Sequence, residues 1–291
     1  MDSDPPFSRL ALIGVGYIGG SAALAARRAG LVGGVTGYDV APQAGSLALA
    51  RGVVDEMAGS AEDAAAGASL VLLATPVRSL ASLVRRIAGR LAPTATVIDV
   101  GSVKQPVGLE ADAALPDGRF VGCHPMAGAE HGGVAAADPE IFVGRMCFLC
   151  PSDRTSAEAV RAAEQFWRGL GCQVASIEAS LHDRLMAAVS HLPHVAAFAL
   201  AASLSDALPL VESNALAGRP TTSLRDTIRI AASSPQVWRD ILLANREYLL
   251  PLVRELEHRV STLGAAMAAG DAAALEAALT LGQACRQRLV K

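Results

Sequence analysis

Gly14-Val-Gly16-Tyr-Ile-Gly19, near the start of this 291-residue chain, decides the fold of the N-terminal half. The motif follows an apolar run over residues 9–14, which predicts a strand, and opens an alanine-rich segment over residues 19–29, which predicts a helix. In a G-x-G-x-x-G turn of this kind, the first glycine permits the tight turn, the second lets a pyrophosphate approach the backbone, and the third allows close helix–strand packing. We therefore predict a Rossmann-type domain whose cofactor-binding residues begin with Gly14, Gly16, Tyr17, Ile18 and Gly19.

The second predicted strand, over residues 34–39, ends on the carboxylate of Asp39. At that place a carboxylate accepts hydrogen bonds from the adenosine ribose hydroxyls, and it repels the 2′-phosphate of NADP. No arginine follows Asp39 closely, so we expect NAD rather than NADP as the cofactor. The alternative is an ordinary glycine turn beside a surface aspartate.

The whole chain divides into two parts of different character. Up to residue 178, short apolar runs alternate with helical segments, which predicts an α/β fold with a parallel, doubly wound sheet. Beyond that point, alanine- and leucine-rich helical stretches run almost to Lys291. Their broad apolar faces, as over residues 186–204, exceed what one small bundle buries, and a second copy would cover them. We expect a Rossmann domain over 1–178, an all-helical substrate and dimerisation domain over 179–291, and a homodimer.

Composition excludes several other classes of protein. The formal net charge is −3, whereas a nucleic-acid-binding surface needs a basic excess. No stretch of 18 apolar residues without a charge is evident, so we expect no membrane span. The first six residues are acidic and interrupted by proline, unlike a secretory signal, so we expect a cytoplasmic protein.

The five cysteines do not form the even, regular set typical of a disulfide framework. Cys147 and Cys150 make a C-x-x-C pair, which admits a redox or metal-binding role. They lie in an apolar run that predicts a strand, where residues three apart point to opposite faces. We therefore interpret both as core residues and expect no metal site.

Three further strand ends carry candidate chemistry, because ligands of open α/β sheets bind beyond the carboxyl ends of the strands. Thr75 and Pro76 close one strand and are expected to line the nicotinamide side. Ser102 follows the next strand, and His124 ends the one after it. An imidazole has a suitable pKa to accept a hydroxyl proton during hydride loss, although a structural histidine at a strand end is equally compatible with this pattern.

The helical part contains a second polar cluster. His191 and His194 lie one helical turn apart, and Arg225 and Arg229 are spaced to leave one helix face, with Trp238 following. Two guanidinium groups on one face suit a dicarboxylate substrate, because each binds a carboxylate through two hydrogen bonds. A solvated helix face with surface ion pairs is the alternative, and a zinc site at the two histidines lacks an evident third ligand.

At these residues the sequence resembles the prephenate/arogenate (cyclohexadienyl) dehydrogenases of tyrosine biosynthesis over nearly its whole length. The matching stretches span residues 14–20, 99–104, 124–130, 190–194, 225–231 and 238–240. The resemblance implies an N-terminal NAD domain and a C-terminal helical dimerisation domain. It also implies catalytic roles for His124 and its neighbour Ser102.

The resemblance extends to the substrate side of the site. It implies that Arg229 binds a substrate carboxylate, with Arg225, His191 and His194 nearby, and that Glu130 and Trp238 shape or gate the pocket. His182 also falls near a histidine of the family. Thr221-Thr222-Ser223 stands where many relatives carry a glycine-rich turn near the substrate side chain, so Ser223 joins the candidate substrate residues and the choice between prephenate and arogenate stays open.

The expected reaction is the oxidative decarboxylation of prephenate to 4-hydroxyphenylpyruvate, or of arogenate to tyrosine, with hydride transfer to NAD. One alternative is another two-domain enzyme, a β-hydroxyacid dehydrogenase or imine reductase. Those enzymes are expected to use a lysine or aspartate of the helical domain, yet the only lysines are Lys104 and Lys291. A second alternative is a catalytically silent NAD-sensing protein, which an assay with prephenate distinguishes.

Overall fold

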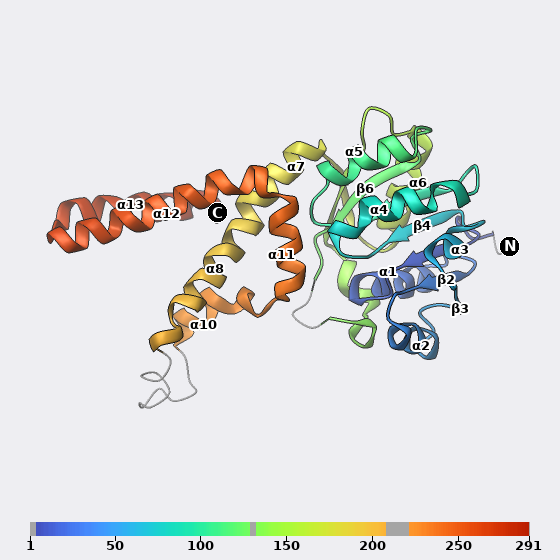
Figure 1. Ribbon diagram of the computed structural model, residues 1–291, viewed down its shortest axis with the longest axis horizontal. Coiled ribbons are helices and arrows are strands. Elements are labelled where there is room, and N and C mark those ends of the chain that lie inside the picture. Colours follow the sequence, from blue (N-terminus) through green and yellow to red (C-terminus); the bar gives the residue numbers. More distant parts are fainter. Residues whose placement is uncertain (1–3, 129–131, 208–220, 291) are drawn as a thin grey trace.

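The computed structural model describes residues 4–128, 132–207 and 221–290, which form two parts (Figure 1). The N-terminal part is a sheet with helices on both faces, and the C-terminal part consists of helices that extend away from it. The strand-rich part ends with β8 (Gln173–Ser176), and the first helix of the second part, α7 (Ala179–Met186), begins three residues later.

The sheet has eight strands in the order β3-β2-β1-β4-β5-β6-β7-β8. Because β1 pairs with both β2 and β4, the chain winds outward in two directions from β1, and the crevice for a ligand opens at that switch point. The remaining strands are β1 (Leu10–Ile13), β2 (Val35–Tyr38), β3 (Glu56–Met57), β4 (Leu70–Leu73), β5 (Thr96–Asp99), β6 (Phe120–Pro125) and β7 (Met146–Cys150).

One expectation about the sheet is wrong. The strands β1 to β6 are parallel, but β7 runs antiparallel to β6, and β8 is parallel to β7. A parallel return needs a crossover, usually a helix. Between β6 and β7 the described residues form only the short 3-10 turns η2 (Val134–Ala136) and η3 (Pro139–Phe142), so the chain returns in the opposite direction.

Helices cover the two faces of the sheet with separate apolar clusters. One cluster joins the sheet to α1 and α6, with Trp167 and Phe166 fully buried, and the other joins it to α3, α4 and α5, with Leu80 and Ile87 fully buried. Continuous apolar strands such as β1 and β4 fit this arrangement, because they are buried on both faces. The helices are α1 (Tyr17–Arg28), α2 (Pro42–Ala50), α3 (Ala61–Ala65), α4 (Val77–Ile87), followed by the turn η1 (Ala88–Arg90), α5 (Gln105–Ala114) and α6 (Ala157–Gly169).

The second part begins with a long helical run through α7, the π-helical turn η4 (Ala187–His191) and α8 (Leu192–Ser203). Pro193 lies just after η4; proline has no amide hydrogen for the helical ladder, and the wider turn accommodates that interruption. The later elements are η5 (Ser205–Ala207), α10 (Thr222–Ile228), η6 (Arg229–Ala232), α11 (Pro235–Ala244), α12 (Arg246–Ala269) and α13 (Ala272–Leu289).

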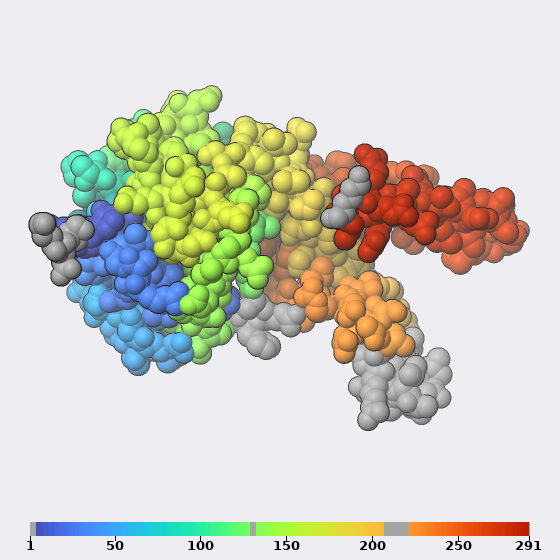
Figure 2. All heavy atoms as spheres, turned by 180° about the vertical axis from the view of Figure 1, so that it is seen from behind, coloured from blue at the N-terminus to red at the C-terminus, as the bar shows by residue number. Residues whose placement is uncertain are grey.

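Helices α12 and α13 form a hairpin that projects from the rest of the molecule (Figures 1 and 2). Gly270 ends α12 in the left-handed conformation, with φ of 63°, and Asp271 caps α13 by accepting from the amide of Ala274. Large apolar side chains such as Val260, Met267 and Leu279 are exposed on this hairpin.

The run Ala179–Ser203 is long and apolar enough to cross a membrane by length and composition alone, with a mean hydropathy of 1.6. The expectation that no such stretch exists therefore fails on that criterion. Only 22% of its most apolar window is buried, which leaves a broad apolar face uncovered within one chain.

Candidate active site

The glycine turn after β1 has the geometry that its spacing predicts. Gly14 has φ of 97°, and a Cβ at that position would lie 2.5 Å from the carbonyl oxygen of Ala74. A Cβ at Gly19 would lie 2.3 Å from the carbonyl oxygen of Gly14, because α1 packs closely on the strand. At Gly16 a Cβ would meet nothing within 4 Å, so its backbone faces open space.

That open space fits the pyrophosphate of a dinucleotide. Gly16 caps α1 without any side-chain hydrogen bond, so the first-turn amides and the positive end of the helix dipole remain available to an anion. Tyr17 and Ile18 form the first turn of α1 and are partly exposed. A cavity of about 700 Å³ opens here, and its lining includes Gly14, Gly16, Thr75 and Pro76.

Asp39 lies at the end of β2 and lines the same cavity. One carboxylate oxygen accepts from the amide of Val15 at 2.9 Å, and the other accepts from the amide of Ala41 at 2.8 Å. These bonds hold the carboxylate beside the glycine turn, where a ribose would lie.

His124 is held at the end of β6 by a buried ion pair beneath it. Lys104 and Asp99 form this pair with both side chains fully buried. Asp99 also accepts from the amide of Cys123 at 2.8 Å, and the Lys104 ammonium donates to the carbonyl oxygen of Cys123 at 2.8 Å. Every polar group of the pair is thus engaged around the residue before His124, which fixes the backbone that presents the imidazole.

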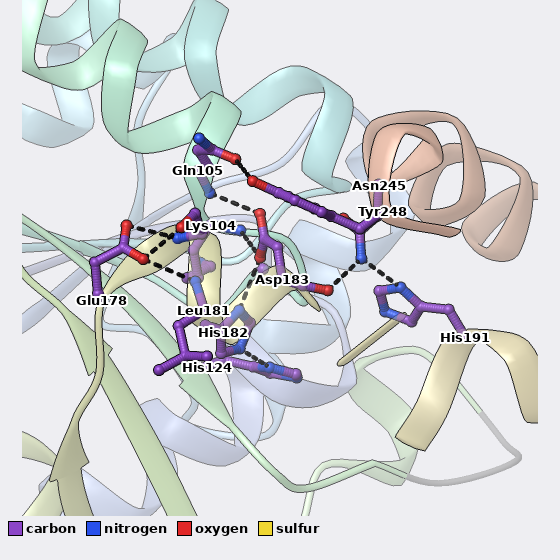
Figure 3. Close-up of polar contacts among 12 residues, drawn as sticks. Lys104, Gln105, His124, Glu178, Leu181, His182, Asp183, His191, Asn245 and Tyr248 are labelled. Atoms are coloured by element: carbon purple, nitrogen blue, oxygen red, sulfur yellow. Dashed lines mark hydrogen bonds and ion pairs between the residues drawn. The ribbon is translucent and has the colours of Figure 1, made fainter. Parts of the chain in front are cut away.

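The His124 ring contacts the helical domain directly (Figure 3). Its Nδ1 lies 2.9 Å from Nε2 of His182, and Nδ1 of His182 lies 2.8 Å from a carboxylate oxygen of Asp183. Enclosure by protein lowers the pKa of His124 well below its usual value, and the nearby His182, Lys104 and His191 lower it further. The ring is therefore neutral and able to accept a proton at neutral pH.

His191 ends the π-helical turn and is buried. Its Nδ1 accepts from the side-chain amide of Asn245 at 2.9 Å, and the same amide donates to the carbonyl oxygen of Asp183 at 2.8 Å. Burial lowers the pKa of His191 to about 4, opposed by Asp183. Asn245, between α11 and α12, thereby links α7, which carries His182, to η4, which ends at His191.

His194 lies against Trp238 of α11 as a stacked pair, with ring centroids 3.5 Å apart and planes 18° apart. His191 approaches the same indole edge-on at 5.9 Å. Arg229 lies near enough to His194 to lower its pKa, although burial is the larger cause. His191, His194, Trp238 and Arg229 are thus brought into one neighbourhood by η4, α8, α11 and η6.

Other residues singled out from the sequence lie differently. Ser102 follows β5, and its side chain makes no hydrogen bond to His124 among the described contacts. Arg225 is exposed and lies 3.7 Å from Asp226. It belongs to α10, whereas Arg229 begins the 3-10 turn η6, so the two do not share one regular helix. Ser223 is exposed in the first turn of α10, and Glu130 lies outside the described residues.

Cys147 and Cys150 are both buried in β7, and burial raises the pKa of each thiol, which disfavours a metal-binding thiolate. Among the described residues, no group of three or more histidine, cysteine or acidic side chains is arranged to hold a metal ion.

Sequence reasoning missed Asp183 and Asn245, which connect His182 and His191 within the helical domain. The only local signal for Asp183 is its position directly after His182. Nothing local marks Asn245, because its partners are 54 and 62 residues away.

The helical domain reaches both parts of the site, because Asp240 of α11 lines the cofactor crevice and His182 of α7 contacts His124. This arrangement places the protein among the two-domain nicotinamide-dependent dehydrogenases. Residues 22–176 match the family described as "Prephenate dehydrogenase, nucleotide-binding domain", and residues 178–281 match "Prephenate dehydrogenase, dimerization domain". The chain belongs to the prephenate dehydrogenase family, which confirms the resemblance inferred from its sequence.

Individual relatives agree with this assignment. The chain is 33% identical to the cyclohexadienyl dehydrogenase of Zymomonas mobilis over 270 residues, which cover 91% of this chain and 90% of that protein. A crystal structure of prephenate dehydrogenase from Aquifex aeolicus, in complex with hydroxyphenyl propionate and NAD+, matches with a TM-score of 0.84 and 31% identity over 97% of this chain and 98% of that one. Synechocystis arogenate dehydrogenase matches with a TM-score of 0.77 and 25% identity, covering 97% and 100% of the two chains.

Proposed function

We propose that this protein catalyses the oxidative decarboxylation of prephenate, of arogenate, or of both, in tyrosine biosynthesis. The observation that carries the proposal is His124, a neutral imidazole at the end of β6 and in contact with the helical domain. Membership of the prephenate dehydrogenase family supplies the substrate class.

The chain's own residues have distinct tasks in this reaction. A bound nicotinamide ring supplies the hydride acceptor. His124 accepts the proton of the ring hydroxyl while hydride leaves the carbon that bears it. The bond to the ring carboxylate then breaks, because release of carbon dioxide makes the ring aromatic. Thr75 and Pro76 line the cofactor crevice, and Ser102 lies at the next strand end, where it is suited to hydrogen-bond the substrate hydroxyl.

Recognition of the substrate falls to the helical domain. Arg229 is suited to bind a substrate carboxylate through its guanidinium fork, and it lies near His194, whose ring stacks on Trp238. Arg225, His191, Glu130 and Ser223 remain candidates for the rest of the pocket. The preference between prephenate and arogenate depends on the group that faces the substrate side chain.

The proposal also covers the cofactor, the assembly and the location of the protein. What supports NAD over NADP is the Asp39 carboxylate beside the glycine turn. A homodimer is supported by the match to a dimerisation domain and by the uncovered apolar face of residues 179–203. We place the domain boundary between residues 178 and 179, and the protein in the cytoplasm with other enzymes of amino-acid synthesis.

The test is turnover by the purified chain, followed as reduced cofactor at 340 nm, with each substrate and each cofactor in parallel. We expect reduction of NAD with at least one of the two substrates, together with release of carbon dioxide. Binding of NAD without turnover of either substrate would instead indicate a cofactor-sensing protein.

A further inference from the structure

His182 and Asp183 are consecutive residues of α7, both buried, at the junction of the two domains. We infer that they are positioning residues which hold His124 in the tautomer that carries its proton on Nδ1 and leaves the lone pair of Nε2 for the substrate. The inference rests on the proposed function of His124 as the base, and it names the side chains that prepare it.

The argument starts at Asp183, whose carboxylate caps the start of α5 from the neighbouring domain. One of its oxygens accepts from the amide of Lys104 at 2.8 Å, and the other accepts from the amide of Gln105 at 2.8 Å. Backbone amides only donate, so both carboxylate oxygens accept, an arrangement that suits the acceptor-only ionised side chain. The start of a helix also favours a negative charge.

The ionised carboxylate of Asp183 determines which ring nitrogen of His182 carries a hydrogen. The same Asp183 oxygen that accepts from Lys104 lies 2.8 Å from Nδ1 of His182, so this nitrogen must carry a hydrogen. In the neutral ring, Nε2 of His182 is then an acceptor. It lies 2.9 Å from Nδ1 of His124, which must therefore donate.

The orientation of these hydrogen bonds determines the state of Nε2 of His124, the nitrogen that would accept the substrate proton. A neutral His124 with its hydrogen on Nδ1 has an unprotonated Nε2, which is the nitrogen that a general base needs. When Nε2 takes up the substrate proton, the Nδ1 hydrogen bond to His182 persists, with the Asp183 carboxylate behind it to offset the new charge.

This arrangement also links the base to the packing of the two domains. Asp183 belongs to α7 of the helical domain, whereas its amide donors begin α5 of the cofactor domain. The carbonyl oxygen of Asp183 accepts from Asn245, and Tyr248 of α12 donates to the side chain of Gln105 at 2.8 Å (Figure 3). The tautomer of His124 is thus set only when α7, α12 and the start of α5 are correctly docked.

The first experiment reads the proton positions directly in the intact protein. Long-range ¹H–¹⁵N NMR of the histidine-labelled enzyme distinguishes a protonated ring nitrogen from one with a lone pair. At pH 7.5 we expect both His124 and His182 to carry hydrogen on Nδ1 alone. His124→Asn and His182→Gln assign the two sets of signals, and His258→Gln, at an exposed site on α12, is the matched control. A hydrogen on Nε2 of His124 in the resting enzyme would overturn the inference.

The second experiment compares two replacements of His182. In His182→Gln the amide oxygen can accept from His124 and the amide nitrogen can donate to Asp183, so we expect kcat within about tenfold of the original. His182→Leu leaves Nδ1 of His124 without an acceptor, and loss of such an orienting partner typically costs about 10–100-fold. Equal kcat values for the Gln and Leu variants would contradict the inference.

The pH profile separates positioning from a merely structural role. The charged and titratable groups around His124 are Asp99 and Lys104 below β6, His182 and Asp183 on α7, and His191 on η4. His182→Gln keeps an uncharged acceptor for Nδ1 of His124, so the acid limb of kcat/KM should stay where it is in the unmutated enzyme. A limb that moves to higher pH in this variant would mean that His182 carries a positive charge and donates to His124, which would overturn the inference.

The outcomes distinguish this inference from the proposed function. If both rings carry their hydrogens as inferred but neither substrate is oxidised, the proposed function fails while the proton arrangement stands. If substrate is oxidised but Nε2 of His124 is protonated at rest, the function stands and the positioning role of His182 and Asp183 is rejected. His182→Leu failing to fold affects neither the NMR result nor the pH profile of His182→Gln.

Discussion

The two parts of the molecule differ in how completely each buries its own apolar residues. In the cofactor domain every residue of β1, β4 and β5 is buried, with helices on both faces of the sheet. In α12 only Leu249 and Ala266 of 24 residues are buried, and no residue of α13, which is described throughout, is buried. The cofactor domain therefore buries its own apolar core, whereas the helical domain leaves apolar surface exposed that a second chain can cover.

The largest expected effect is on assembly. We expect light scattering to give twice the chain mass of 29.8 kDa at micromolar concentration. Met267→Glu combined with Leu279→Glu places charge on the exposed apolar surface of the α12–α13 hairpin and should shift the protein to monomer, because an unpaired charge is costly to bury. Leu109→Glu, on an equally exposed leucine of α5, is the control and should remain dimeric. A monomeric unmutated protein would remove the explanation for the open helical surface.

The next effect concerns the point where the two parts meet. His124→Asn keeps a polar side chain that can donate to His182 but that cannot take up a proton. Because general-base catalysis typically contributes about 10²–10⁴-fold, kcat should fall by that order while substrate and cofactor still bind. In the unmutated enzyme the acid limb of kcat/KM should lie below pH 6.5, since the pKa of His124 is lowered by burial.

Two results with His124→Asn would contradict the role of His124 as the base. Near-normal turnover of His124→Asn with an unchanged acid limb would remove His124 from the chemistry and direct attention to His191 and His194. Loss of binding with little loss of kcat would assign His124 to holding the substrate.

The contrast between the two parts also explains what the sequence could predict. The turn from β1 to α1 and the ends of β2 and β6 follow from local signals: glycine spacing, apolar runs and the residue at which each run stops. These signals suffice because a buried parallel strand must be apolar throughout and its ligands must lie at its end. The sequence therefore predicts correctly that His124 and Asp39 lie at strand ends.

Features that depend on distant partners were not predictable in the same way. The reversal of β7 depends on how residues 132–145 return to the sheet, and β3 and β8 are too short or too exposed to stand out. In the helical part, η4 and η6 change the helical pitch near His191 and Arg229. The i, i+4 spacing of Arg225 and Arg229 in the sequence therefore did not reveal that they lie on different helical segments.

The two arginines provide the next prediction. Arg229 is exposed, and a bound substrate would have to cover its guanidinium. Removing one partner of a charge pair buried in this way typically costs ~2–5 kcal/mol, so Arg229→Ala should raise the substrate KM strongly and leave NAD affinity nearly unchanged. Arg225 is 66% exposed beside Asp226, and Arg225→Ala should cost less than about 1 kcal/mol. Equal effects of both variants on KM, or equal loss of NAD binding, would show that Arg229 does not hold the substrate carboxylate.

A smaller effect concerns the pH dependence of stability. The pKa of His191 is about 4 in the folded protein and about 6.5 in an unfolded chain, so between these values only the unfolded state binds the proton. Stability should therefore be unaffected above pH 6.5 and should fall by roughly 3 kcal/mol as pH drops to 4. Urea unfolding at pH 7.5 and 4.5 measures this, and His191→Gln should reduce the loss, whereas His258→Gln, at an exposed site, should not. An identical loss in His191→Gln would mean that other groups govern the acid sensitivity.

The smallest effect is on cofactor choice and lies wholly within the cofactor domain. The Asp39 carboxylate lines the cavity, and at a solvated site its repulsion of a 2′-phosphate about 4 Å away is ~1 kcal/mol. Asp39→Ser removes the charge but keeps a short side chain that can still accept from the amide of Val15, so the preference of kcat/KM for NAD over NADP should narrow by roughly fivefold. Asp55→Ser is the matched control, because Asp55 also accepts from a β2 amide, that of Val35 at 2.7 Å, but lies at the opposite end of the strand. It should leave the preference unchanged. Equal use of both cofactors by the unmutated protein would show that Asp39 only braces the glycine turn, and the cofactor domain would then be selective for the pyrophosphate alone.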